Sequence, residues 1–239
     1  QDHPELLALY FDETQKVRPV GSKIVNPVYA QTLRKIAAQG PSAIWTEGAG
    51  AEFVAATQKG YRPSLMTEDD LKNYKVEQRQ PLCAPYLQYK VCVMAPPSFG
   101  GVVVLQVLQI LETKWGNRVD FSQPDFAHTF AEAGKLAQVD RHQYVADPGF
   151  FKVPAEALVK ADYLKQRAAL IQHQTLSSYK AGQPLTLSAL TAPLETAQVA
   201  VAPSSDATSQ LAVVDADGNA VTMTSTNNLN FGSRILVQG

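Results

Sequence analysis

The chain has 239 residues, of which 45% are hydrophobic and 18% charged, a balance typical of one large or two small folded domains. Its formal net charge of −1 provides no basic field to hold nucleic acid, so electrostatics exclude that class of partner. The longest apolar run begins at Val102 and is broken by Gln106 and Gln109, which makes it too short and too polar to span a bilayer.

The first residues are polar and resemble neither an initiator segment nor a signal peptide. Residues 1–5 read Gln-Asp-His-Pro-Glu, with no methionine and no apolar core. We therefore expect the chain to begin inside a longer protein.

Helical spacing and capping residues predict a helix-rich first part. Asn26 can cap a helix, Pro27 suits its first turn, and Gly40 ends the apolar pattern. Thr67 and Asp70 have the spacing of a capping box at the start of another turn. Further helices are predicted over residues 41–46, 53–60, 100–111, 124–145 and 155–172.

Residues 82–94 alternate and are rich in Tyr and Val, which predicts two short strands. Cys83 and Cys92 lie in this predicted hairpin, and facing strands would allow them to pair. Two isolated cysteines are more often buried small hydrophobic residues, by about three to one. The pair therefore does not fix the redox compartment.

The amino-acid composition changes between His173 and Ala207, where Thr, Ser, Ala, Leu and Pro dominate and charges are few. We interpret this stretch as an exposed, poorly ordered connector. A pattern typical of β-strands resumes at Gln210. The predicted organisation is a helix-rich portion at 1–172, a flexible linker at 173–207 and a β-hairpin portion at 208–239.

Residues 208–226 read as a hydroxyl residue, an apolar strand, a tight turn at Asp217-Gly218 and a return strand. Counting back from the turn places Thr226 near the head of the first strand, beside Thr208. Asn228 follows two residues later, so alternation puts it on the face of Thr226. Ser and Thr are also ordinary strand residues, and the spacing alone fits a plain hairpin as well.

A threonine hydroxyl is a weak nucleophile unless a base removes its proton. If Thr208 is the first residue of a chain, its own α-amino group, with a pKa of about 7.7–8.0, can act as that base. The chain must first be cut, by attack of the Thr208 hydroxyl on the carbonyl of Ala207 and hydrolysis of the resulting ester. This hypothesis makes Thr208 and Thr226 the catalytic residues, Asn228 a substrate-binding residue and Ala207-Thr208 the cleavage site.

No metal site is expected. The stretch Asp215 to Asn219 superficially resembles a calcium loop, but its glycine comes too early and no Glu closes it. The four histidines lack the spacing of metal ligands, and they are His3, His128, His142 and His173.

Residues 208–221 resemble the start of the small subunit of gamma-glutamyltransferases, where the pattern is Thr-Thr-His-x-Ser-Val-Val-Asp-x-Asp-Gly-Asn-Ala-Val. Residues 224–233 are similar to that family's Thr-x-Thr-x-Asn-x-x-Phe-Gly segment. Other stretches that look like family motifs are 67–74, 95–101, 109–112, 140–141 and 147–150. The resemblance spans most of residues 24–239.

This resemblance implies an α+β fold, part of the αββα sandwich of the N-terminal-nucleophile hydrolases. It implies that Thr208 attacks the γ-glutamyl amide of glutathione or a related compound, after which water or an amino-acid amine accepts the glutamyl group. Thr226 matches the threonine that hydrogen-bonds the nucleophile, and Asn228 matches the asparagine that contacts the amino end of the glutamyl group. No metal or organic cofactor is expected, since hydroxyl, amine and oxyanion donors suffice. By family analogy the location is periplasmic or extracellular.

The sequence also departs from the family pattern. Ser209 and Gln210 replace Thr and His beside the nucleophile, and Phe99 replaces a small residue. The family's substrate-clamping arginine and oxyanion glycines have no counterpart here. We therefore expect an incomplete piece, inactive alone, whose partners are the remainder of the large and small subunits. Two alternatives stay open: an acylase of the same scaffold acting on another acyl amide, cephalosporin-acylase-like, and a degenerate non-catalytic binding domain.

Overall fold

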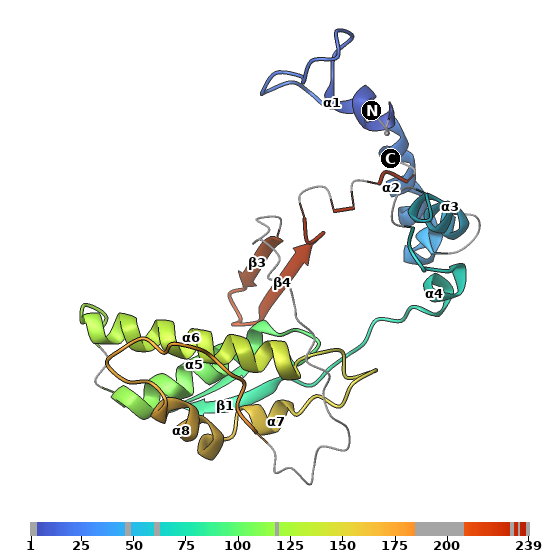
Figure 1. The fold of residues 1–239 in the computed structure, drawn as a ribbon. Helices are drawn as coiled ribbons and strands as arrows, with labels where there is room; N and C mark the ends of the chain where they lie inside the picture. The colour runs from blue at the N-terminus through green and yellow to red at the C-terminus, as the bar shows by residue number, and fades with distance from the viewer. Residues whose placement is uncertain are drawn as a thin grey trace. The chain divides into compact units, whose positions relative to one another are not determined.

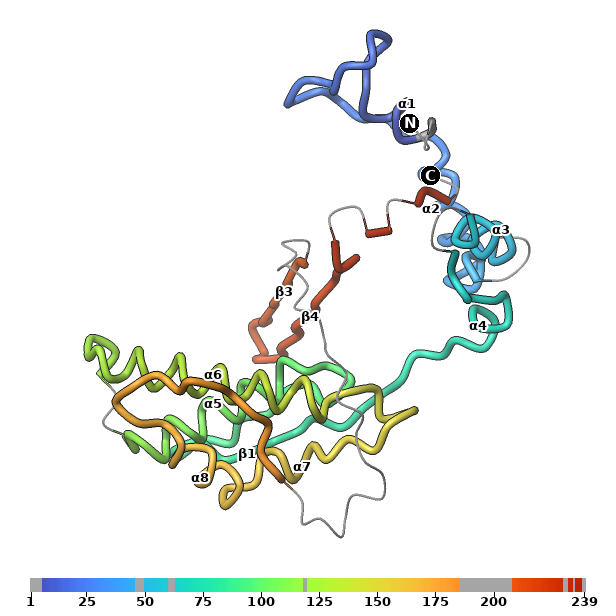
Figure 2. The backbone as a smooth tube through the Cα atoms, in the orientation of Figure 1, coloured from blue at the N-terminus to red at the C-terminus, as the bar shows by residue number. Residues whose placement is uncertain are grey.

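The structure is a computed structural model, and it describes residues 4–45, 49–59, 63–117, 120–184, 208–229, 232–233 and 235–237. The chain is α+β (Figures 1 and 2). It separates into two units, one formed by residues 1–76 with 202–239 and the other by residues 77–201. The predicted portions at 1–172, 173–207 and 208–239 stay a prediction.

The first unit contains short helices and a β-hairpin. Its helices are α1 (Pro4–Tyr10), α2 (Pro27–Gln39), the 3-10 helix η1 (Pro41–Ile44), α3 (Ala49–Thr57) and α4 (Glu68–Asn73). The predicted caps are confirmed: the Asn26 side chain accepts from the Tyr29 N–H at 2.9 Å, and Thr67 and Asp70 form a capping box at α4.

The second unit is built around two long helices that lie side by side (Figure 1). Its elements are β1 (Leu82–Tyr86), β2 (Tyr89–Val93), α5 (Gly100–Trp115), α6 (Pro124–Tyr144), α7 (Ala155–Leu158) and α8 (Ala161–Ala169). β1 and β2 pair as an antiparallel hairpin that packs on α5, and α8 packs on α5 and α6. The single helix predicted over 155–172 is two helices, separated at Val159 and Lys160.

The core of this second unit combines apolar packing with a buried charge. Leu105, Ile110 and Leu136 are each 1% exposed. Among them lies Asp140 of α6, also 1% exposed, whose carboxylate pairs with Arg167 of α8 at 2.9 Å. A carboxylate in such a position requires hydrogen-bond donors on all sides, because a buried charge without partners is strongly unfavourable.

Donors from several elements meet that requirement. The Tyr163 hydroxyl donates to Asp140 at 2.7 Å, and the Gly182 N–H donates at 2.9 Å. The Gln106 amide lies 3.4 Å from the same carboxylate. Burial raises the pKa of Asp140, although each of these donors and Arg167 opposes the effect. Asp140 therefore pairs with Arg167 of α8 and not with its sequence neighbour Arg141.

The segment predicted as an exposed connector is ordered over its first part, residues 173–184. It runs along α6, visible as the orange strip in Figure 2. The Glu132 carboxylate, 1% exposed, accepts from the Leu176 N–H at 3.2 Å and from the Tyr179 hydroxyl at 2.7 Å. Burial raises the pKa of Glu132, but its hydrogen bonds outweigh burial and the net pKa lies below the ordinary value. Residues 185–207 lie outside the described chain.

A second anchor holds the end of this segment at Gly182. Besides the bond from its N–H to Asp140, its carbonyl accepts from the Tyr144 hydroxyl at 2.6 Å. A side chain at this position would collide with the Tyr163 hydroxyl, so the close approach requires glycine. The composition of residues 173–184 suggested disorder, but their backbone N–H groups donate hydrogen bonds to buried carboxylates of α6.

Phe99, which departs from the family pattern, has a defined contact. The guanidinium of Arg141 lies over its ring, 3.4 Å from the centroid. Arg141 also donates to Gln138 at 2.8 Å. The aromatic residue therefore provides a stacking surface for Arg141 at the start of α5.

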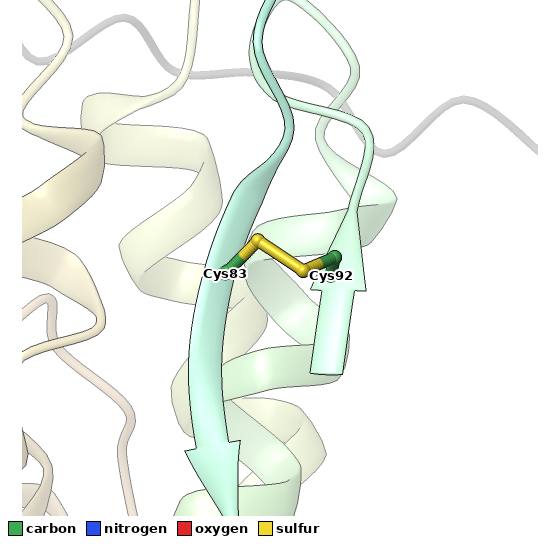
Figure 3. The surroundings of a disulfide bond; sticks show 2 residues. All are labelled: Cys83 and Cys92. Atoms are coloured by element: carbon green, nitrogen blue, oxygen red, sulfur yellow. A yellow bond between two sulfur atoms is a disulfide. The ribbon is translucent and has the colours of Figure 1, made fainter. Parts of the chain in front are cut away.

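Cys83 and Cys92 form a disulfide, so the interpretation as buried thiols is wrong (Figure 3). The register of β1 and β2 places the two residues directly opposite, with Cα atoms 4.1 Å apart. Direct pairing across an antiparallel hairpin brings the side chains onto the same face. The general frequency of unpaired cysteines carries no information about this register, so it could not predict the disulfide.

We expect Asp140→Asn to lower the free energy of unfolding by about 3–5 kcal/mol, because it leaves the Arg167 guanidinium buried without an anion. Urea unfolding of wild type and variant measures the difference. The matched control is Asp162→Asn, which removes an exposed ion pair with Lys165 on α8 at 3.8 Å and should leave stability unchanged. Equal changes in the free energy of unfolding for the two variants would contradict a structural role for the buried Asp140–Arg167 pair.

Candidate active site

β3 (Thr208–Val214) and β4 (Ala220–Thr226) form the antiparallel hairpin of the first unit (Figure 1). Their register places Thr208 directly opposite Thr226, and Val214 opposite Ala220. The structure thus brings together the two residues that the sequence predicted as nucleophile and partner. Ala207, on the other side of the predicted cleavage site, lies outside the described residues.

The turn between the strands is organised by the Asp215 carboxylate. The connecting loop has five residues, Asp215 to Asn219, and is longer than the tight turn predicted at Asp217-Gly218. One oxygen of Asp215 accepts from the N–H groups of Asp217 at 3.0 Å and Asn219 at 2.8 Å, and the other accepts from the Asn219 amide at 2.8 Å. These bonds, led by the Asn219 side chain, lower the pKa of Asp215. Gly218 takes the positive φ of 83° that the turn requires.

Two groups converge on the hydroxyl oxygen of Thr226. The Thr208 hydroxyl donates to it at 2.9 Å, and the backbone N–H of Asn228 donates at 2.9 Å. A hydroxyl oxygen can accept two hydrogen bonds while keeping its own proton to donate, and incoming donors polarise that proton. Thr226 can therefore turn its proton toward the Thr208 oxygen when negative charge builds there.

Asn228 does not continue the strand alternation. β4 ends at Thr226, and Asn228 has a φ of +67°, which breaks the two-residue period. The argument that placed its side chain on the face of Thr226 therefore fails. Its backbone N–H contacts Thr226, and its role in substrate binding stays a prediction.

The hairpin separates a polar face from an apolar one. The face of Thr208 carries Gln210, Ala212, Val214, Ala220, Thr222, Thr224 and Thr226. The opposite face carries Leu211, Val213, Val221 and Met223, with Ser209 and Ser225 at the end next to the Thr208–Thr226 pair. Sequence reasoning singled out Thr208 and Thr226 but not the polar residues between them. The same alternation, applied to both strands, would have found them.

Gln210 occupies the middle of the polar face. Its carboxamide accepts a hydrogen bond from the Thr224 hydroxyl and donates one to the Thr222 oxygen. Gln210, Thr222 and Thr224 therefore form a hydrogen-bonded set beside the Thr208–Thr226 pair.

The described part of the chain contains no group of three or more His, Cys, Asp or Glu side chains placed to hold a metal ion. The chemistry available around Thr208 in this structure is that of hydroxyls, amides and backbone N–H groups. Such groups support acyl transfer through an oxygen nucleophile.

The profile of the gamma-glutamyltranspeptidase family matches residues 1–239. This chain belongs to the gamma-glutamyltranspeptidase family. It is 33% identical over 235 residues to the glutathione hydrolase proenzyme of Escherichia coli, covering 98% of this chain and 38% of that relative. It is also 33% identical over 239 residues to an acylase ACY 1 proenzyme of a Pseudomonas species, covering 99% of this chain and 39% of that relative. The chain thus spans about two fifths of the length of these curated relatives.

Solved structures agree with this family membership. The cephalosporin acylase of Bacillus halodurans matches with a TM-score of 0.77 and 26% identity, covering 99% of this chain and 39% of that chain. The gamma-glutamyltranspeptidase of Helicobacter pylori matches with a TM-score of 0.67 and 27% identity, covering 74% of this chain and 51% of that chain. A protein named as a cephalosporin acylase and one named as a gamma-glutamyltranspeptidase therefore both resemble this chain in structure.

Proposed function

We propose that the whole protein carrying this chain transfers or hydrolyses γ-glutamyl groups of glutathione and related amides, with Thr208 as the nucleophile. The observation that carries the proposal is the hydrogen bond between the hydroxyls of Thr208 and Thr226, at the head of β3, in a gamma-glutamyltranspeptidase chain. Relatives named proenzymes support synthesis as a precursor.

Self-cleavage at Ala207-Thr208 would create the active form. The Thr208 oxygen attacks the carbonyl carbon of Ala207, the peptide C–N bond breaks, and the nitrogen takes the proton to become the free α-amine. Water then hydrolyses the ester, which returns the hydroxyl to Thr208 and leaves a carboxylate on Ala207. The products are two chains, and the second begins with Thr208.

Turnover uses the amine that cleavage creates. With a pKa of about 7.7–8.0 the α-amine accepts the hydroxyl proton near neutral pH while the oxygen attacks the γ-glutamyl carbonyl. The leaving amine takes that proton, and the glutamyl ester is resolved by water or by an amino-acid amine. Thr226 donates to the Thr208 oxygen as charge develops, and Asn228 contacts the amino end of the glutamyl group.

An acylase that acts on another acyl amide is the second candidate, and the acylase relatives favour it. γ-Glutamyl and glutaryl anilides separate the two functions, because the glutaryl group lacks only the α-amino group. We expect the whole protein to prefer the γ-glutamyl anilide by at least about 10-fold in kcat/KM, the worth of one charged hydrogen bond. A preference for the glutaryl anilide would instead assign the acylase function.

Several features bear on location and partners. The Cys83–Cys92 disulfide supports an oxidising compartment such as the periplasm or the cell exterior. None of the described helices is both long and apolar enough to cross a membrane. The proposed partners are the γ-glutamyl substrate, a water or amino-acid acceptor, and the rest of the large and small subunits.

Thr208→Ala tests the nucleophile directly. We expect the variant of the whole protein to remain one chain and to lose about 10⁴-fold or more in kcat, because both reactions need the hydroxyl. Gel electrophoresis and N-terminal sequencing report the cleavage, with Thr208→Ser as the matched control that keeps a hydroxyl. A new chain beginning at residue 208 in the Ala variant would refute the proposal, and an uncleaved wild type would favour a non-catalytic binding domain.

Thr226→Val tests the hydroxyl that faces the nucleophile. The substitution keeps the shape of the side chain but removes a donor to an oxygen that becomes charged, so kcat should fall about 10- to 100-fold with KM nearly unchanged. Thr226→Ser should retain most of the activity. Equal rates for the Val and Ser variants would show that the hydroxyl has no catalytic role.

A further inference from the structure

The hydrogen bonds of Gln210 have no part in the proposed reaction, yet they lie beside its nucleophile. Gln210 is two residues from Thr208 on the same strand and the same face. Its carboxamide bridges two hydroxyls of β4, accepting from Thr224 and donating to Thr222. Thr224 in turn is two residues from Thr226. The bridge therefore links the two strands at the position adjacent to the Thr208–Thr226 pair.

The position of this bridge matters because of what cleavage does to β3. After cleavage Thr208 is the first residue of a chain, and chain ends fray unless other contacts hold them. A two-stranded hairpin is also marginally stable by itself. Any loss of pairing at the first residues of β3 would separate the Thr208 oxygen from the Thr226 hydroxyl.

We propose that Gln210 is a positioning residue, whose bridge to Thr222 and Thr224 keeps the cleaved end of β3 paired so that Thr208 stays against Thr226. This inference rests on the proposed function of Thr208. The hydrogen bonds of its carboxamide go to Thr222 and Thr224, and it acts through the register of the strands.

The bridge requires a particular end group on the side chain. The carboxamide offers one acceptor and one donor at the same reach, which matches the two hydroxyls. A leucine has similar size and suits a strand, but it can form neither bond. A glutamate can accept from both hydroxyls and so preserves the bridge, but it adds a charge to a face that carries no ionisable side chain between Thr208 and Thr226.

The experiment compares Gln210→Leu and Gln210→Glu in the whole protein, with Ser209→Ala as the matched control on the opposite face. We expect Gln210→Leu to slow self-cleavage and to lower kcat by about 10-fold, from two lost hydrogen bonds, with KM changed less than about 2-fold. Gln210→Glu should keep kcat at high pH. In the pH profile of kcat for this variant, the acid limb should move to higher pH. A nearby carboxylate raises the pKa of the Thr208 α-amine, and the ammonium form of that amine cannot act as a base. Ser209→Ala should match the wild type in both rates.

A double variant separates positioning from packing. If Gln210 acts through Thr224, then Thr224→Val should cost less in the Gln210→Leu background than in the wild type. The role of Gln210 would be overturned if Gln210→Leu cleaved itself and turned over at wild-type rates. It would also be overturned if the acid limb of the pH profile of kcat were unshifted in Gln210→Glu. Both results would leave the role of Thr208 intact. Failure of the wild type itself to cleave and turn over would instead overturn the proposed function.

Discussion

The register of β3 against β4 is the constraint on which the candidate site depends. Side chains alternate along a strand, so a shift of one residue moves every partner to the other face. A strict two-residue turn at Asp217-Gly218 would place Asn227 opposite Thr208. The five-residue loop that the Asp215 carboxylate organises places Thr226 there instead. The hydroxyl pair is therefore set by a carboxylate at the far end of the hairpin.

The second unit shows the same dependence on carboxylates, here inside a core. Glu132 and Asp140 lie on α6, and each accepts a backbone N–H from the segment 173–184. Removing that segment would leave buried acceptors without donors, which is costly in a medium of low dielectric. The segment is therefore part of the folded body of this unit. Residues 183–207 separate the anchor at Gly182 from Thr208 in the sequence.

Local patterns predicted the parts of the fold that local interactions decide. The caps at Asn26 and Thr67 each involve residues three positions apart, so the sequence contains both partners of each bond. Bonds between distant residues were not predictable in this way. The partners of residues 173–184 lie on α6, and composition alone suggested disorder. The disulfide depends on the register of β1 and β2, and Gln210 was recognised only as a departure from a family pattern.

The alternation of the hairpin also explains how Thr208 can have polar neighbours on a strand whose other face is largely apolar. Leu211, Val213, Val221 and Met223 lie on the opposite face, and each is between 50% and 64% exposed in the described structure. An apolar face of this kind is stabilised when other parts of a protein cover it. Covering it would hold the hairpin in place without desolvating the hydroxyls, because these lie on the other side of the backbone. The separation of faces thus allows the rest of the protein to stabilise Thr208 without contacting it.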